Sequence, residues 1–480
     1  MTRREFISCG AAFAASPFIP DAALAAAKDG LRLRFGVMAD IHINLMQWSQ
    51  KKWPVALKWF DKQGADAIMV CGDMADYGVE VELKLVADEW FKVFPGNCRS
   101  DGQPVVNLLH YGDHDMSHGI YKRLQKANMD KYYGGEEGIA NNLIWNRNPG
   151  EIWERCFHEK WAPVQIKNVK GYDFVLSHFT IGEPNNKWGN NTPELGPTLA
   201  GHKFDPKKPF FHSQHRLYRG TVCGPIAWGQ EDGSTGRLLS KYPNCVAFCG
   251  HGHYMAQQEN MIWQGDYTAL QVPSLSYLST ESTCRHENGY GSYCGKDKDE
   301  RTSPPQMGYF QYGHALQVYL VDVYDDRIVI HRHEVSTDLP VADDWVIPLD
   351  AATRPYTHAA IAERAKAPQF AASAKATWKV IKGKDRKGEP TDQLEVTFPV
   401  ATSPRAYDFE VVVAAGEKRL KRNVYSNRCC FPPSKDTDPG RCLFALAELP
   451  AAPEACRIAV RPREIFGKAG KAIMVKGKKA

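Results

Sequence analysis

The sequence predicts an α/β fold followed by an all-β domain, and three observations support this. Between residues 31 and 115, apolar strand-like runs alternate with runs of helical spacing. Between residues 371 and 460, short strand-like runs alternate with turn signals. An Ala-rich stretch at 351–370 separates the two patterns. Alternating strands and helices are typical of a parallel sheet, whereas closely spaced strands are typical of a β-sandwich.

The first of these patterns contains three strands and two helices. We expect strands at 31–39, 67–71 and 105–110 and helices at 48–62 and 80–94, with Pro54 in the first turn of the earlier helix. Acidic or histidine side chains follow each of the three strands. Ligands bind beyond the carboxyl ends of parallel strands, so we expect these side chains to meet at one edge of the sheet.

Further elements complete the predicted first domain, which spans residues 28–350. We expect strands at 174–177, 210–213 and 246–248, a helix at 236–241, and a hairpin formed by 316–323 and 328–335. Residues 116–173 form an insertion with a helix near 152–161. It is too long for a simple connection, so it is either a lid over a site or a packed structural insert.

A second predicted domain spans residues 371–480, after a linker at 351–370. Its expected strands are 376–381, 393–398, 407–413, 442–447 and 455–460. Their spacing suggests a β-sandwich of immunoglobulin or fibronectin type. The basic stretches at 418–422 and 468–479 are interpreted as solvated faces.

Composition places few restrictions on the function. The 480 residues include 43% hydrophobic and 24% charged residues, which is ordinary for a globular protein. A net charge of +5 is slight and the basic residues are scattered, so no nucleic-acid partner is indicated. No later run reaches the length of a membrane span. The sequence leaves the oligomeric state open.

The N-terminus resembles a twin-arginine export signal. Residues 2–7 read Thr-Arg-Arg-Glu-Phe-Ile, a weakly apolar run follows, and Ala23-Leu24-Ala25 offers a cleavage site. We therefore expect residues 1–27 to be a signal peptide read by the twin-arginine export machinery, and the mature protein to be periplasmic or secreted. The alternative is a disordered Ala-rich arm.

Cysteine content fits export to an oxidising compartment. The sequence has 13 cysteines, and loss of Cys9 with the signal leaves an even number. Some disulfides are therefore expected, although sequence alone does not fix their pairing. The candidates close short loops: Cys284 with Cys294, and Cys429 or Cys430 with Cys442.

Five short blocks of potential metal ligands occur in order between residues 40 and 253. Four of the five follow an apolar, strand-like run directly. Carboxylates and imidazoles are costly to place there unless they bind metal or move protons. The blocks are Asp40-x-His42, Gly72-Asp73-x-x-Asp76, Gly112-Asp113-His114-Asp115, Gln214-His215 and Gly250-His251-Gly252-His253.

In this order the blocks resemble those of the calcineurin-like metallophosphoesterases, whose pattern is D-x-H, G-D-x-x-D, G-N-H-D/E, H and G-H-x-H. The resemblance covers residues 32–340 and implies a four-layer α/β-β/α sandwich that hydrolyses phosphate esters. One position departs from the pattern, because Asp113 stands where the family has Asn.

Carried over residue by residue, the resemblance implies two sets of metal ligands. Asp40, His42 and His253 would hold a first divalent ion, and His215 and His251 would belong to a second. The two ions would be manganese, iron or zinc, because mixed oxygen and nitrogen ligands suit all three.

The remaining family positions imply a shared ligand and a general acid. Asp73 would bridge the two ions, and Asp113 would take the second-ion position of the family Asn. His114 would stabilise the phosphoryl oxygens or protonate the leaving group, while Asp115 would orient its ring. Asp76 is expected to support the loop by hydrogen bonding.

The extra charge of Asp113 bears on the substrate. A third carboxylate lowers the positive charge available to an incoming phosphate, and a dianionic monoester suffers more from this than a monoanionic diester. The sequence therefore favours a phosphodiester. The alternatives are a sugar- or lipid-linked pyrophosphate, or a non-catalytic cell-surface binding protein that kept the fold.

Two histidines compete for the fourth block. His178 and His215 each follow an apolar strand-like run. We favour His215, because the run before it resembles the fourth-block strand of exported family members and because one crossover can connect it to His251. His178 is the alternative.

Overall fold

The structure is a computed structural model, and part of the chain is described in it. The expected signal peptide, Cys294, Cys429 and Cys430 lie outside the described part. The described residues are 30–46, 49–117, 119–180, 192–223, 227, 229–279, 284–285, 292–293, 311–312, 316–350, 352–384, 389–403, 406–426 and 439–477.

The N-terminal region contains a first mixed sheet with strand order β16-β15-β14-β1-β2-β3, and β17 also pairs with β15. Strands β1, β2 and β3 are parallel, and β14 runs antiparallel to β1. The strands are β1 (Leu33–Met38), β2 (Ala67–Val70), β3 (Val106–Leu109), β14 (Gln317–Val323), β15 (Arg327–Glu334), β16 (Leu339–Pro340) and β17 (Trp345–Pro348). The expected hairpin is β14–β15.

A second mixed sheet has the order β4-β5-β6-β7-β9-β8. Its inner strands β5, β6, β7 and β9 are parallel, and β4 and β8 pair antiparallel at the edges. The strands are β4 (Val164–Val169), β5 (Tyr172–Ser177), β6 (Phe210–Gln214), β7 (Cys245–Cys249), β8 (Ile262–Gln264) and β9 (Thr268–Gln271).

The two sheets pack against each other through alternate residues of their strands. In β2, Met69 belongs to the core between the sheets, whereas Ile68 and Val70 belong to the core under the helices. The ring of Phe35 in β1 lies 4.8 Å from that of Phe211 in β6. Because successive side chains of a strand point to opposite faces, an all-apolar strand is buried on both sides.

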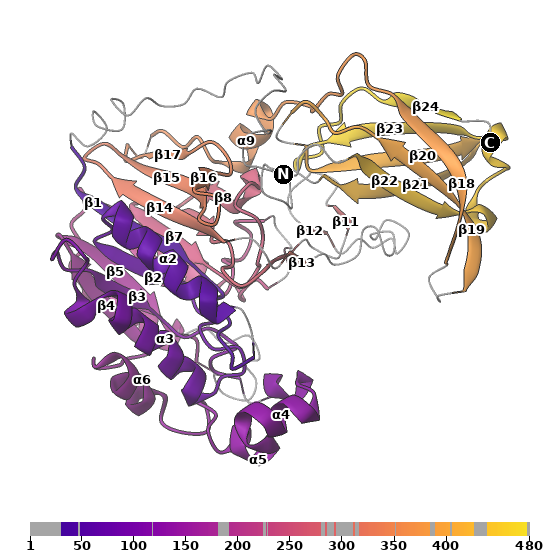
Figure 1. The fold of residues 1–480 in the computed structure, drawn as a ribbon. Coiled ribbons are helices and arrows are strands. Elements are labelled where there is room, and N and C mark those ends of the chain that lie inside the picture. Colours follow the sequence, from indigo (N-terminus) through magenta and orange to yellow (C-terminus); the bar gives the residue numbers. More distant parts are fainter. Residues whose placement is uncertain are drawn as a thin grey trace, which may run out of the picture.

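Helices α2 (Ser49–Gln63) and α3 (Glu80–Val93) lie beside β1–β3 on the face away from the second sheet (Figure 1). Helices α7 (Thr192–Gly201) and α8 (Ser234–Leu239) add buried leucines to the core of the second sheet. The α/β prediction is therefore confirmed. Pro54 lies inside α2 rather than in its first turn, because the helix begins at Ser49.

The insertion at 116–173 is built into the domain over part of its length. Its helix α6 (Pro149–Phe157) packs into the core under α3 through Ile152 and Trp153, and β4 is an edge strand. The helix ends at Phe157, and the next residue, His158, adopts a left-handed conformation. The other helices, α4 (Lys126–Tyr133) and α5 (Gly135–Ala140), form a small separate core. These contacts support the packed insert over the lid.

The C-terminal region is all β, as expected. Seven strands follow one continuous path, β21-β20-β23-β24-β18-β19-β22. They are β18 (Ala376–Lys384), β19 (Pro390–Phe398), β20 (Asp408–Ala415), β21 (Lys418–Tyr425), β22 (Gly440–Ala445), β23 (Arg457–Arg463) and β24 (Ile473–Gly477).

This path is a near-barrel rather than two separate sheets. Strand β24 pairs with β23 through Ile473 and Met474 and with β18 from Val475 onward, so it joins the two halves. Arg422 in β21 donates to the carbonyl of Leu443 in β22, which brings the two end strands together. The likeness to an immunoglobulin or fibronectin domain stays a prediction.

Both basic stretches contain strands that the sequence pattern did not predict. In β21, Lys421 is exposed while Arg422 and Val424 are buried. The buried Arg422 is accommodated because it pairs with Glu448 at 2.6 Å and lies over the ring of Phe444. Buried and exposed residues therefore alternate along β21 as in other strands. The sequence pattern does not reveal this, because the inward-facing residue is the charged Arg422.

The two regions are connected through helix α9 (His358–Arg364), which lies within the expected linker (Figure 1). Ile361 in this helix shares a buried core with Ile465 and Phe466 from the C-terminal region. Lys468 Nζ donates to the carbonyls of Glu363 at 3.0 Å and Ala365 at 2.8 Å. The linker is thus a packed junction.

The remaining short elements are β10 (Leu278–Ser279), β11 (Cys284–Arg285), β12 (Ser292–Tyr293), β13 (Gln311–Tyr312), and the 3-10 turns at Pro95–Asn97, Ile120–Arg123, Glu259–Met261, Leu446–Glu448 and Pro453–Ala455. Within the described ranges, no helix is both long and apolar enough to cross a bilayer.

The cysteines of the described part give no support to the disulfide prediction. Eight of them are free thiols, including the buried Cys442 that was a candidate for pairing. Its candidate partners, like Cys294, lie outside the described residues. The Cys284–Cys294 pair therefore stays a prediction, and the expected bond to Cys442 is not supported, because Cys442 is a free thiol in the described part.

Candidate metal centre

The predicted ligands gather where the strands of both sheets end. Asp40, Asp73 and Asp113 follow β1, β2 and β3, while His215 and His251 follow β6 and β7. All of these strands are parallel to a neighbour within their own sheet. Because the two sheets face each other, five chain segments converge on one point, as the sequence pattern predicted.

One group combines Asp73, Asp113, His215 and His251, whose candidate ligand atoms all lie within 4.8 Å of one another. His215 Nε2 is 3.1 Å from Asp73 Oδ2 and 3.2 Å from Asp113 Oδ1. His251 Nδ1 is 3.4 Å from Asp113 Oδ2 and 3.2 Å from His215 Nε2. Two imidazoles and two carboxylates therefore face a common point.

A second group combines Asp40, His42 and His253 within the same limit of 4.8 Å. His253 Nε2 is 3.1 Å from Asp40 Oδ1 and 3.2 Å from His42 Nε2. His42 Nε2 also lies 3.7 Å from Asp73 Oδ2. Asp73 is thus a neighbour of both groups.

Hydrogen bonds fix the ring orientations in a way that suits cation binding. His253 Nδ1 lies 3.1 Å from the carbonyl of Tyr277, and His215 Nδ1 lies 2.8 Å from that of Cys71. Each Nδ1 therefore donates its proton outward, and each Nε2 presents a lone pair to the centre. His42 is oriented in the same way, because its Nδ1 lies 3.2 Å from Asp76 Oδ1. The Nε2 atoms of His42 and His253 lie 3.2 Å apart, so their lone pairs repel each other unless a cation or proton lies between them.

The orphaned oxygen of Asp113 also fits a cation. Its Oδ1 is buried and accepts no hydrogen bond, although His215 Nε2 lies 3.2 Å away. A buried charged oxygen without a donor is costly. The donor set, mixed carboxylate and imidazole, suits manganese, iron or zinc.

Unusual backbone angles support the same centre. Five of the seven predicted ligands have positive φ: Asp40 at 53°, His42 at 49°, Asp73 at 54°, His251 at 68° and His253 at 55°. Non-glycine residues rarely adopt this region, and such strain concentrates at functional sites. The fold therefore holds these side chains in orientations that an ordinary loop does not provide.

Two glycines allow the segments to approach. A Cβ atom on Gly112 would overlap the backbone nitrogen and the carboxylate of Asp73. Gly72 has φ +82°, and a Cβ atom there would come within 2.6 Å of His215 Nδ1. Both blocks need glycine at these places because the three loops are in direct contact.

The partners of His114 correct one prediction. His114 Nδ1 lies 2.7 Å from the carbonyl oxygen of Asp76 and 3.5 Å from its carboxylate. The carboxylate of Asp115 instead accepts backbone hydrogen bonds from Gly112 at 2.6 Å, Ala75 at 2.6 Å and Met74 at 3.2 Å. Asp76 orients the His114 ring, and Asp115 holds the two loops together.

The charges of the site shift several pKa values. Burial lowers the pKa of His114, but the nearby carboxylates of Asp73 and Asp76 outweigh it and raise that pKa to about 10. Burial also raises the pKa of Asp113, yet His251 and His215 hold it well below its usual range. Burial and the charge of Asp73 raise the pKa of Asp115 to about 7.

Sequence reasoning missed Arg216, which follows His215 directly. Its Nη2 lies 2.8 Å from Asp113 Oδ2, and its side chain is buried. An arginine one residue beyond an expected ligand has no periodic signal of its own. The extra acid at position 113 was the one clue that a cation would be needed nearby.

The competing histidine lies away from both groups. His178 is buried among Tyr111, Trp153 and Trp161, and its Nδ1 accepts from the backbone of Tyr111 at 3.2 Å. Burial holds its pKa well below the usual value. His178 is therefore a structural residue, and His215 is the one that faces Asp73.

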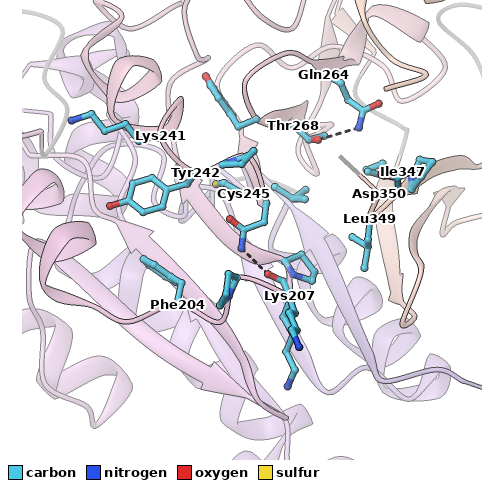
Figure 2. Close-up of a pocket in the computed structure, with 18 of the residues that line it drawn as sticks. Phe204, Lys207, Lys241, Tyr242, Cys245, Gln264, Thr268, Ile347, Leu349 and Asp350 are labelled. Carbon is cyan, nitrogen blue, oxygen red and sulfur yellow. Dashed lines mark hydrogen bonds between the residues drawn. The ribbon is translucent and has the colours of Figure 1, made fainter. Parts of the chain in front are cut away.

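A cavity of about 570 Å³ lies at the end of the second sheet opposite to the candidate metal centre (Figure 2). Its lining includes Phe204, Lys207, Tyr242 and Cys245, the last being the first residue of β7. The predicted ligands follow the last residue of that strand. This cavity is therefore separate from the candidate metal centre.

Comparisons with known proteins agree with this geometry. The sequence model of the family described as Calcineurin-like phosphoesterase matches residues 33–255, a range that contains all seven predicted ligands. No curated protein matches the chain in sequence.

Among solved structures, a dimetal phosphatase from Danio rerio is 12% identical with a TM-score of 0.37, covering 67% of this chain and 100% of that one. A purple acid phosphatase from yellow lupin seeds is 12% identical with a TM-score of 0.35, covering 66% and 53%. PhoD is 8% identical with a TM-score of 0.38, covering 68% and 72%. These scores are too low to add to the assignment. On the strength of the family match and the clustered aspartates and histidines, this chain is a metallophosphoesterase hydrolase of the calcineurin-like family.

Proposed function

We propose that the chain hydrolyses a phosphate ester with two divalent metal ions, one held by each group of ligands and both contacted by Asp73. The position of Asp73 carries this proposal. Its Oδ2 lies 3.1 Å from His215 Nε2 and 3.7 Å from His42 Nε2, so one carboxylate faces both groups. Two such ions polarise a phosphoryl group and make hydroxide available near neutral pH.

In this proposal His114 supplies the proton for the leaving group. Its backbone N–H donates to Asp73 Oδ1 at 2.8 Å, which fixes the residue beside the centre. Its Nδ1 donates to the carbonyl of Asp76, so Nε2 is the atom that passes a proton to the departing oxygen. A side chain that is 22% exposed is open to a substrate from one side.

The expected preference for diesters needs revision. It rested on the third carboxylate, Asp113, lowering the positive charge of the centre. Arg216 lies 2.8 Å from that carboxylate and offsets its charge. The charge of Asp113 alone therefore does not favour diesters, and the proposed substrate class is a phosphate ester.

The proposal is tested by metal content and turnover together. Protein purified without chelator is expected to contain about two metal ions per chain, because the two groups described above both lie beside Asp73. A third possible group, His42, Asp76 and His114, shares His42 with one of them. It should hydrolyse at least one member of a panel of phosphomonoesters, phosphodiesters and pyrophosphates. Metal-free protein that cannot be reconstituted would favour the non-catalytic alternative.

We also propose that the chain is exported by the twin-arginine pathway to the periplasm or beyond. The signature at residues 2–7 supports this, and a chain exported when folded can acquire its ions in the cytoplasm. Mass spectrometry of the mature protein should show that residues up to about the Ala23-Leu24-Ala25 site are missing. An intact N-terminus on exported protein would contradict the proposal.

A further inference from the structure

The pair formed by Arg216 and Asp113 crosses between the two sheets. Asp113 follows β3 of the first sheet, and Arg216 lies just beyond β6 of the second. Their atoms Nη2 and Oδ2 are 2.8 Å apart. The Arg216 side chain is 8% exposed and lies 5.7 Å from the ring centroid of Phe179. The guanidinium is thus largely desolvated and held over an aromatic ring.

Burial makes this charge pair strong. In a site shielded from water, a guanidinium and a carboxylate at hydrogen-bond distance interact far more strongly than on the surface. The positive guanidinium of Arg216 therefore offsets the charge of Asp113 at Oδ2, while Oδ1 still faces His215 at 3.2 Å.

The pair restores the charge of the centre. The two ligand groups contain three carboxylates, which are Asp40, Asp73 and Asp113. One guanidinium cancels one carboxylate, so the net charge is that of a centre with two carboxylates and a neutral ligand at position 113. Without Arg216 the centre would be more negative by one charge.

We propose that Arg216 is a specificity-determining residue of this phosphoesterase, which sets the preference between dianionic monoesters and monoanionic diesters by neutralising Asp113. The proposal rests on the function proposed above. Arg216 acts on the substrate through the charge of Asp113. Asp113 and Arg216 together therefore behave as one neutral ligand.

Single substitutions should then have opposite effects. Arg216→Gln leaves the Asp113 charge unopposed, so the ratio of monoester to diester kcat/KM should fall about tenfold. The same change should tighten Mn²⁺ binding to metal-stripped protein about tenfold, because the Asp113 carboxylate is no longer paired with Arg216. Asp113→Asn leaves Arg216 unopposed, and both quantities should move the other way.

The double variant Asp113→Asn/Arg216→Gln tests whether the two charges act as a unit. Its substrate ratio and Mn²⁺ affinity should both return to within about threefold of the wild type, so that the effects are strongly non-additive. Arg216→Lys keeps the charge and should leave the ratio close to the wild-type value. Additive effects in the double variant, or an unchanged ratio in Arg216→Gln, would overturn the proposal.

A matched pair elsewhere separates this effect from a general loss of stability. Arg34 and Asp322 are also partly buried and lie 2.6 Å apart, on strands β1 and β14. Arg34→Gln is expected to lower the melting temperature without changing the substrate ratio. If Arg216→Gln does not fold, Asp113→Asn, Arg216→Lys and the double variant still decide the question.

Failure of the underlying function would look different. Wild-type protein that binds no Mn²⁺ and turns over no phosphate ester would remove the proposed function, and this inference with it. Wild-type protein that binds about two ions and is active, but shows no coupling between Asp113 and Arg216, would remove this inference alone.

Discussion

Asp73→Asn is expected to remove bound metal and to lower phosphate-ester turnover by at least about a thousandfold. The asparagine keeps the shape of the side chain and an oxygen that can accept from the His114 backbone, a bond of 2.8 Å in the wild type. It loses the charge that faces both His42 and His215. A centre that depends on one shared carboxylate should then lose affinity for both ions.

Elemental analysis of the purified variant, beside steady-state kinetics with added Mn²⁺, checks this expectation. Asp322→Asn is the matched control, because Asp322 is equally buried and bonded but lies outside both ligand groups. The control should keep its metal and its activity. An Asp73→Asn protein with about two ions per chain and wild-type turnover would rule out the shared role of this carboxylate.

His114→Gln is expected to keep its metal but to lose kcat by a factor of about 10² to 10⁴. His114 belongs to neither group proposed to hold an ion, although it could form a third group with His42 and Asp76. Its Nδ1 donates to the Asp76 carbonyl. Replacing His114 therefore removes a proton donor but leaves the proposed metal ligands in place. The loss should be greatest for alkyl esters, whose leaving oxygen needs a proton, and smallest for nitrophenyl esters, whose leaving group does not.

A series of esters with leaving groups of increasing pKa measures this dependence directly. His202→Gln serves as the control, because His202 pairs with Asp173 at 2.9 Å and lines the separate cavity near the start of β7. It should leave the whole series unchanged. An equal loss for every leaving group in His114→Gln would exclude proton donation, and a loss of metal would make His114 a ligand instead.

Much of the catalytic region could be predicted because its signals are local. Strands β1, β2 and β3 are short apolar runs that alternate with helices, and an aspartate follows each strand within four residues. Parallel strands place their carboxyl ends at one edge, so the order of the blocks was enough to bring Asp40, Asp73 and Asp113 together. The preference for His215 over His178 agrees with the placement of the two rings.

Other features depended on contacts between distant segments. Asp115 is the sequence neighbour of His114, yet the His114 ring is oriented by Asp76. This happens because the loop after β2 contacts the loop after β3. Strand β21 was obscured because its inward-facing Arg422 looks solvated until Glu448 is brought beside it. Neither the Asp76–His114 contact nor the Arg422–Glu448 pair leaves a pattern in the sequence from which it could be predicted.

The sequence by itself determined the family, the α/β region, the all-β C-terminal region and the identity of the residues that converge. Each follows from the type and spacing of neighbouring residues, which act over one strand or turn. The tertiary structure alone decided the positive φ of the ligand residues, the near-barrel path of the last seven strands and the pairing of Arg216 with Asp113. That pair joins residues 103 positions apart, and only the packing of one sheet on the other sets the distance between their charges.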